Sequence, residues 1–156
     1  RSTYNIANYK KIIFFPTTPL ISETISIINM LIMTIKKLND YNNTLLIIKH
    51  HPNTKNMKEY NQLVKQAIDY HNLFIKQYWD SINFHHFIKM SDCLVTSGGS
   101  APFEAMLLNT PSIIFLNDAQ FSHNPMQEYQ EAAFFYCAHA IFRAQVSYEQ
   151  EVRPGL

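Results

Sequence analysis

Short, unbroken apolar runs recur along the chain, separated by longer segments with a helical spacing of apolar side chains. The runs cover residues 12–15, 45–48, 73–75, 93–95 and 113–116. An apolar run without alternation is typical of a strand that is buried on both faces, as in a parallel sheet. The pattern therefore predicts five buried strands, and a sixth short strand is expected over residues 140–143.

The segments between the runs are predicted to be helices. In residues 57–68 apolar side chains recur every three or four positions and leave polar ones on the opposite face. A second helix is expected to open at Ser22, with Glu23 and Thr24, and to run to Ile35. Further helices are expected over residues 80–89, after Gly99, and over residues 127–139. Strands and helices that alternate in this way predict an α/β fold, a Rossmann-like doubly wound parallel sheet of about six strands.

The length of 156 residues suits one compact domain. We expect a linker over residues 1–9, the domain over 10–152 and a tail over 153–156. The chain starts at Arg1 without the apolar centre of a signal peptide, so we interpret it as a piece of a longer protein. The longest apolar stretch, residues 25–35, is interrupted by polar residues and is far shorter than the ~20 residues that span a bilayer, so no transmembrane segment is predicted.

Charge and cysteine content narrow the possible partners. The 13 Lys and Arg residues nearly balance the 12 Asp and Glu residues, which gives no electrostatic reason to expect nucleic acid as a partner. Cys93 and Cys137 lie far apart and outside any Cys-x-x-Cys pair, so neither a disulfide framework nor a cysteine zinc site is predicted. A reducing cytoplasm is the simplest location. Of only three glycines, Gly98 and Gly99 are adjacent, which concentrates glycine at one turn.

Ligands of open parallel sheets bind beyond the carboxyl ends of the strands. After the second run the chain reads Lys49, His50, His51, Pro52. Pro52 keeps His51 extended, so its imidazole can donate to a phosphate oxygen, with Lys49 as a nearby positive charge. A solvated polar strand exit explains these residues equally well. Because neighbouring side chains of a strand point to opposite faces, the histidine pair does not predict a metal site.

The second candidate loop follows the fourth run and contains Thr96, Ser97, Gly98, Gly99 and Ser100. Two glycines permit unusual backbone angles, Ser100 can cap a helix, and Pro102 suits a first helical turn. Such a turn before a helix can hold a phosphate on backbone amides. Glu104, one turn into the helix, fits either a hydrogen bond to a ribose diol or a carboxylate favoured by the helix dipole.

Several other residues carry weaker expectations. His85 and His86 are expected to be packing or surface residues, and the aromatic residues 134–136 are expected to lie in the core. Thr17 and Thr18 follow the first run, where a ligand contact and a turn before Pro19 are equally good explanations. Trp79 could close a pocket or simply pack.

These motifs, in this order, resemble the C-terminal, nucleotide-sugar-binding half of a GT-B glycosyltransferase. The resemblance covers about residues 10–118 and rests on the strand ending at Pro16, the His51-Pro52 motif, the Ser97-to-Ser100 loop with Glu104, and the Thr110-Pro111 strand start. Within that superfamily the chain is similar to bacterial capsule and cell-wall polymer transferases with a His-Pro motif. Examples are polysialyltransferases, capsule Kdo transferases and CDP-glycerol glycerophosphotransferases. The Ser-Gly-Gly and Glu-Ala segments also resemble UDP-N-acetylglucosamine 2-epimerase, which shares the fold.

The resemblance implies a role for each matching residue. His51 would contact a phosphate of the nucleotide, residues 97–100 would cradle the phosphates, and Glu104 would bind the ribose. Many capsule and cell-wall enzymes have adjacent serines where two glycines here separate Ser97 from Ser100, so the base and the number of phosphates stay open among CMP, CDP and UDP donors. Residues 117–120 lack the run expected of the epimerase.

Three hypotheses follow. The first is the donor-binding domain of a glycosyltransferase, whose full-length enzyme would carry an N-terminal acceptor domain and extend a surface or capsular polysaccharide at the inner face of the membrane. It would take a nucleotide-activated sugar or polyol phosphate as substrate and need no further cofactor. The second is an epimerase-like enzyme. The third is a non-catalytic α/β nucleotide-binding or regulatory module.

Overall fold

The computed structural model describes residue 6, residues 8–69, 71–79 and 83–115, and the backbone of residues 135–137. Strands and helices alternate through this part of the chain. In order they are β1 (Lys11–Pro16), α1 (Ile21–Lys36), the 3-10 turn η2 (Tyr41–Asn43), β2 (Thr44–Lys49), the 3-10 turn η3 (Pro52–Thr54), α2 (Lys58–Asp69), β3 (Phe74–Tyr78), α3 (Phe84–Met90), β4 (Cys93–Thr96), α4 (Ala101–Leu107), β5 (Ser112–Ile114) and β6 (Phe135–Cys137).

The strands form one parallel sheet in the order β3-β2-β1-β4-β5-β6. Strands β1 to β5 lie within residues 11–114, and β6 adds three residues beside β5. The chain first builds outward from β1 to β3, then returns to the other side of β1 with β4. The reversal places a topological switch point between β1 and β4, where open sheets of this kind bind ligands. The predicted Rossmann-like α/β fold is confirmed.

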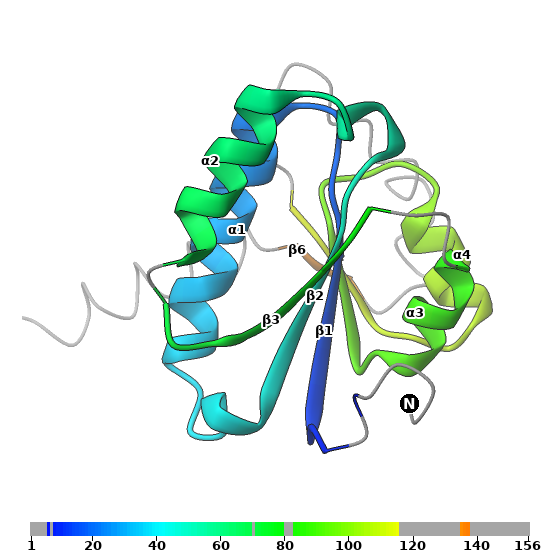
Figure 1. Cartoon of the computed structure of the whole chain (residues 1–156). Helices are drawn as coiled ribbons and strands as arrows, with labels where there is room; N and C mark the ends of the chain where they lie inside the picture. The colour runs from blue at the N-terminus through cyan, green and yellow to red at the C-terminus, as the bar shows by residue number, and fades with distance from the viewer. Residues whose placement is uncertain (1–5, 7, 70, 80–82, 116–134, 138–156) are drawn as a thin grey trace, which may run out of the picture.

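Helices cover both faces of the sheet. Figure 1 shows α1 and α2 against one face and α3 and α4 against the other. Within β1, Phe15 packs into the core beneath α1 and α2, whereas Phe14 packs on the opposite side with Phe87 of α3. All four apolar residues 45–48 of β2 are fully buried. Burial on two faces therefore explains the unbroken apolar runs, at roughly 1.5–3 kcal/mol for each large side chain.

Helix α1 is held by one apolar stripe. Ile27, Ile28, Leu31, Ile32 and Ile35 are buried at the spacing of a helix face that packs on the sheet. The helix begins at Ile21 and its N-cap position is Leu20, so the expected opening at Ser22 is off by one residue.

The predicted helix over residues 127–139 is wrong at residues 135–137, where the backbone is a strand, β6, paired with β5. Aromatic residues favour strands, and a parallel strand beside β5 satisfies their backbone groups. The rest of that helix, the strand expected over residues 140–143 and the side chains of residues 134–136 lie outside the described residues.

The predicted start of the third helix shifts slightly. The third helix starts at Phe84, with Asn83 accepting the His85 N–H, and residues 80–82 lie outside the described part. Ile6, which precedes the expected domain start, is fully buried in the core on the α3 side.

Among the described residues, no helix has the length and apolar character needed to cross a membrane. Burial, and then the charge of Asp92, raise the pKa of the Cys93 thiol to about 11.

Candidate functional site

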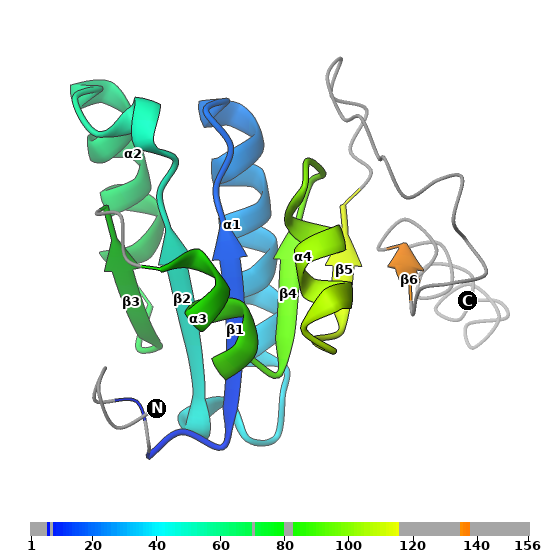
Figure 2. The same cartoon turned by 90° about the vertical axis from the view of Figure 1, so that its right-hand side faces the viewer.

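A cleft of about 920 Å³ opens at the carboxyl ends of the strands, over the switch point. Four segments form it: the loop from β1 into the first turn of α1, His51 between β2 and η3, the start of α3, and the loop from β4 into α4. Figure 2 shows the start of α1 and the loop before α4 at the same end of the sheet. The described residues that line the cleft are Pro16, Thr17, Thr18, Pro19, Leu20, Glu23, His51, Phe84, Thr96, Ser97, Gly98, Gly99, Ser100, Ala101 and Phe103.

The loop after β4 is shaped by Thr96 and the two glycines. The Thr96 hydroxyl donates to the Gly98 carbonyl at 3.0 Å and accepts the Gly98 N–H at 3.3 Å. Gly98 and Gly99 have φ values of 149° and 78°, which L side chains rarely adopt. A Cβ atom built on Gly99 would meet nothing within 4 Å, so a ligand can approach the backbone closely here.

Backbone N–H groups supply the donors of this loop. Within the described residues, the N–H groups of Gly99, Ser100 and Ala101 have no hydrogen-bond acceptor, whereas that of Gly98 is used by Thr96. Successive unpaired amides in a turn make an anion-binding concavity. Helix α4 has only seven residues, so the loop amides matter more than the helix dipole. The unpaired amides thus lie in the loop where the sequence predicts an anion cradle, at Gly99 to Ala101.

His51 borders the same cleft with a defined tautomer. Its backbone is extended, with φ −64° and ψ 136°, as the following proline predicts. The Asn53 N–H donates to His51 Nδ1 at 3.3 Å, so the ring proton belongs on Nε2. The His51 N–H donates to Thr17 Oγ1 at 2.9 Å, which ties the ends of β2 and β1 together. His51 thus keeps an N–H donor, Nε2, for a ligand.

His50 points the other way and is buried. Its ring stacks on Trp79 with centroids 3.7 Å apart. Nδ1 lies 3.0 Å from the Tyr60 hydroxyl, and Nε2 lies 2.9 Å from Gln77 Oε1. Burial lowers the pKa of His50 to about 4, although the hydrogen bond to Gln77 opposes this shift. His50 is therefore neutral and structural, and Trp79 packs against it rather than lining the cleft.

A buried hydroxyl network joins His50 to the cleft. The Tyr60 hydroxyl lies 3.0 Å from both His50 Nδ1 and Thr17 Oγ1. Burial raises the pKa of Tyr60, so this hydroxyl keeps its proton and can donate. Thr17 is itself 5% exposed and lines the cleft. Through the Tyr60 hydroxyl, α2 thus holds the ends of β1 and β2 in place.

The structure separates the eight predicted binding residues into two groups. His51, Thr96, Ser97, Gly98, Gly99 and Ser100 line the cleft, whereas Lys49 and Glu104 do not. Ser100 donates to Glu104 Oε1 at 2.9 Å instead of capping α4, and His85 Nε2 lies 2.9 Å from Glu104 Oε2. Glu104 therefore lies beside the glycine loop, between Ser100 and His85, and His85 is an exposed residue whose ring nitrogen contacts this carboxylate.

The first strand contributes a wall of the cleft that the sequence analysis left partly open. Thr18 and Glu23 line the cleft on the β1 side, and Phe84 and Phe103 add aromatic surface. For Thr17 and Thr18 the sequence left a ligand contact and a turn before Pro19 equally open, and both residues line the cleft at the carboxyl end of β1. Glu23 carried no such signal, because a first-turn glutamate is ordinary in any helix.

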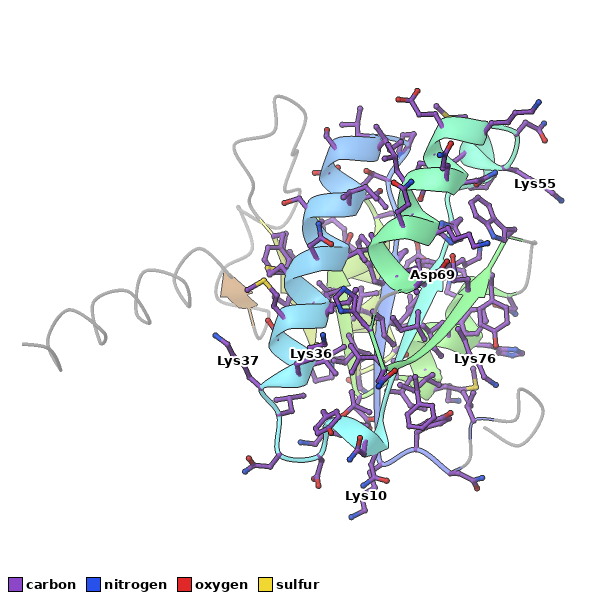
Figure 3. The ribbon with its side chains drawn as sticks, turned by 60° about the vertical axis from the view of Figure 1, so that its left-hand side comes forward. Lys10, Lys36, Lys37, Lys55, Asp69 and Lys76 are labelled. Carbon is purple, nitrogen blue, oxygen red and sulfur yellow. The ribbon has the colours of Figure 1, made fainter. Side chains whose placement is uncertain are left out.

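Basic side chains do not line the described part of the cleft. Figure 3 shows Lys10, Lys36 and Lys37 around the end of the molecule where α1 finishes, opposite the carboxyl ends of the strands. An anion in the cleft would thus meet backbone amides, hydroxyl groups and one imidazole on the described wall, rather than ammonium groups.

A family model described as "Capsule polysaccharide biosynthesis protein" matches residues 22–147, which is most of the chain. The chain belongs to this family. Among curated protein sequences, none matches this capsule-family chain significantly. The family match agrees with the resemblance to capsule transferases that the His-Pro motif and the glycine loop suggested.

Solved structures show the same fold. The UDP-N-acetylglucosamine 2-epimerase of Neisseria meningitidis, bound to UDP-GlcNAc, matches with a TM-score of 0.63 and 17% identity, over 96% of this chain and 39% of that one. MnaA of S. aureus, solved with UDP, matches with a TM-score of 0.56 and 18% identity, over 76% and 30%. The wall teichoic acid polymerase TagF, an H444N form with CDPG, gives 0.51 and 20%, over 81% and 30%.

The capsule-family chain thus spans well under half the length of each of these proteins. At this level of identity the likeness shows the fold alone, a Rossmann-like parallel α/β fold.

Proposed function

We propose that this chain binds the nucleotide-activated donor of a glycosyltransferase that builds a surface polysaccharide. The observation that carries the proposal is the meeting of His51 and the Gly98-Gly99 loop in one cleft over the switch point. Unpaired amides and an imidazole Nε2 are suited to phosphate oxygens. The capsule family and the GT-B fold supply the reaction class.

The chemical role of these residues is to stabilise charge. When the bond between the donor phosphate and the transferred group breaks, negative charge grows on the departing nucleotide phosphate. Amides of Gly99 and Ser100, fixed by the Thr96 hydrogen bonds, need little reorganisation to meet that charge, and His51 Nε2–H adds a second direction. Glu104, held beside Ser100, is our proposed contact to the ribose hydroxyls.

A thermal-shift titration of the chain with CMP, CDP, UDP and GDP tests the proposal. A ligand that binds only the folded state stabilises it by about 2.7 kcal/mol at one hundred times its Kd. We expect stabilisation by at least one nucleotide and a smaller effect of the matching nucleoside, because the phosphates supply the contacts. If none of the four nucleotides stabilises the chain, the result overturns the proposal. It then supports the alternative of a regulatory module that binds no nucleotide.

The epimerase remains the second candidate because an epimerase structure bound to UDP-GlcNAc shares this fold over 96% of the chain. It predicts isomerisation of UDP-N-acetylglucosamine without any acceptor. The transferase predicts donor binding by this chain and transfer only when the acceptor-binding part of the full-length protein is present. Incubating the chain and the full-length protein with UDP-N-acetylglucosamine, with and without polysaccharide, separates the two by product analysis.

A further inference from the structure

An exposed histidine of α3 contacts the carboxylate that lies beside the glycine loop. His85 Nε2 lies 2.9 Å from Glu104 Oε2. Helices α3 and α4 pack next to each other on one face of the sheet (Figure 1), so this contact joins two elements between which the chain forms β4. An ionised carboxylate only accepts hydrogen bonds, so Nε2 carries a proton and donates, whether the ring is neutral or charged. Within the described residues, the basic side chain that contacts Glu104 is that of His85.

The start of α3 holds His85 in place. The Asn83 side chain accepts the His85 N–H at 3.1 Å and caps the helix. The His85 ring lies edge-on to Phe84, with centroids 6.3 Å apart. Phe84 lines the cleft and packs on Phe14, a fully buried residue of β1, with centroids 5.5 Å apart. The imidazole is thus tied to the sheet, although the His85 side chain is 62% exposed.

The other oxygen of Glu104 orients a residue of the cleft. Ser100 donates its hydroxyl proton to Glu104 Oε1 at 2.9 Å, and Ser100 lines the cleft. A serine hydroxyl has one proton, so the Ser100 oxygen then offers only lone pairs to a ligand. The carboxylate oxygens of Glu104 also keep lone pairs, because each accepts more than one hydrogen bond. The two side chains together therefore present acceptors, which suit the hydroxyl groups of a ligand.

The backbone at the same place presents donors. Within the described residues, the N–H groups of Gly99, Ser100 and Ala101 have no acceptor, and they suit a phosphate. Donors for an anion and acceptors for a hydroxyl thus meet at one residue, Ser100. A ribonucleotide carries both kinds of group, because its ribose hydroxyls lie within a few bonds of its phosphate. The juxtaposition fits a ribonucleotide better than a nucleotide without ribose hydroxyls.

We infer that His85 is a positioning residue, which fixes Glu104 so that the Glu104 and Ser100 side chains accept the ribose hydroxyls of the donor nucleotide. The inference rests on the proposed donor-binding function and adds to it a residue that does not itself line the cleft. Because His85 already restricts the Glu104 side chain, which is 26% exposed, less rotamer freedom is lost when the ribose binds. His85 should thus raise the affinity for the ribose hydroxyls and leave that for the phosphates unchanged.

Matched nucleotides measure this effect. Binding of CMP, CDP, UDP and GDP, each compared with its 2′,3′-dideoxy form, is measured by calorimetry on the full chain. The unaltered chain should bind at least one of the four about tenfold or more tightly than its dideoxy form, because hydrogen bonds to a charged carboxylate are lost. His85→Ala should lower this ribo-to-dideoxy ratio by about three- to tenfold, while the affinity for the dideoxy form stays within about twofold.

Further variants locate the effect in the Nε2–H group of His85. His85→Gln keeps a donor near the position of Nε2 and should bring the ratio back to within about twofold of the unaltered chain. His85→Phe keeps a ring beside Phe84 but lacks the donor, and should behave like His85→Ala. His86→Ala changes the neighbouring exposed histidine and should leave the ratio unchanged. Adding His85→Ala to Glu104→Ala should not lower the ratio further, because His85 acts through Glu104.

The outcomes separate a positioning role from a structural one. A ratio near one in the unaltered chain, or an unchanged ratio in His85→Ala, overturns the inference while nucleotide binding stands. An equal loss of affinity for both forms of the nucleotide would mean that His85 supports only the fold, and a further fall in the double variant would mean that it acts without Glu104; either result overturns the inference as well. If none of the four nucleotides binds, the proposed function fails, and the inference with it.

Discussion

The hydroxyl of Tyr60, in the first turn of α2, lies 3.0 Å from Oγ1 of Thr17, in the wall of the cleft. Thr17 also accepts the His51 N–H, so one buried tyrosine supports two cleft residues that lie 34 positions apart. Tyr60 is fully buried and has no contact with the cleft itself. The geometry of the cleft thus depends on Tyr60, a buried side chain that does not itself line the cleft.

Removing that hydroxyl should loosen both cleft residues. Tyr60→Phe leaves His50 Nδ1 and Thr17 Oγ1 without their shared partner, which costs about 1–3 kcal/mol of unfolding free energy. We expect nucleotide affinity to fall by severalfold as well, because Thr17 no longer holds the His51 backbone firmly. Urea denaturation and ligand titration measure the two effects. Tyr41→Phe, at an exposed tyrosine of η2, should change neither, and equal losses in both variants would contradict the prediction.

An added methyl group at Gly99 should weaken phosphate binding. Gly99→Ala places a Cβ in open space at the cleft, where it meets no protein atom but competes with a bound phosphate. The φ of 78° costs an L residue about 1–2 kcal/mol in stability, and we expect at least a tenfold loss of affinity for the nucleotide. Larger side chains such as Val add β-branched strain at the same φ.

Asn109→Ala provides the matched control for Gly99→Ala. Asn109 also has a positive φ, 55°, but it follows α4 and does not line the cleft. The Asn109→Ala variant should lose about 1 kcal/mol of unfolding free energy, while its affinity for the nucleotide stays unchanged. If both variants weaken binding alike, backbone strain rather than occupation of the cradle explains the effect.

The two ring nitrogens of His51 can be tested separately. His51→Asn offers an oxygen to the Asn53 N–H in place of Nδ1 but lacks a donor at the position of Nε2. This variant should bind a nucleoside diphosphate about 10- to 100-fold more weakly, which is the effect of losing a hydrogen bond to a charged group. Its affinity for the nucleoside should stay unchanged. His51→Gln reaches the position of Nε2 and should recover part of the loss. Calorimetry with the nucleotide and its nucleoside measures both, and a similar loss for the two ligands would reassign His51 to structure.

His50 should make the fold sensitive to acid. Its folded pKa of about 4 lies below the ordinary value of 6.5, so the unfolded chain binds more protons between these values. The stability that this difference gives is present above pH 6.5 and is lost as the pH falls toward 4. Between pH 7 and pH 5 the loss is about 2 kcal/mol. His50→Gln should flatten the urea-denaturation stability over this interval, and His86→Gln, at an exposed histidine, should not.

Burial on two faces made most of the fold predictable. The unbroken apolar runs at β1, β2 and β4 indicate strands, because helices cover both faces of the sheet at these strands. The pattern was less informative for β3, an edge strand in which Phe74 is 48% exposed and the polar Lys76 and Gln77 continue the strand past the predicted end. The aromatic residues of β6 fit a helical spacing equally well, and pairing with β5, which sequence spacing cannot show, decides their backbone.

The candidate site was predictable where a loop has an unusual composition. The glycine pair and His51 before a proline stand out in any reading, and both line the cleft. Glu23 looks ordinary in sequence, and only its burial beside Thr18 makes it notable. Glu104 had the right spacing and a local bond to Ser100, but its contact to His85 comes from the packing of α3 against α4, which local sequence does not encode.

The pairing of β1 with β4 has a mechanical consequence. Only two residue pairs, Ile13 with Cys93 and Phe14 with Leu94, join these strands, whereas six join β1 to β2. At Ile12 the Asp92 carboxylate accepts the N–H at 2.7 Å in place of a backbone carbonyl. The pairing of β1 with β4 is thus the shortest in the sheet, and the cleft lies at its carboxyl end. A molecule that contacts Thr18 beyond β1 and Ser100 beyond β4 would bridge these two strands, and amide hydrogen exchange along their pairing should slow when it binds.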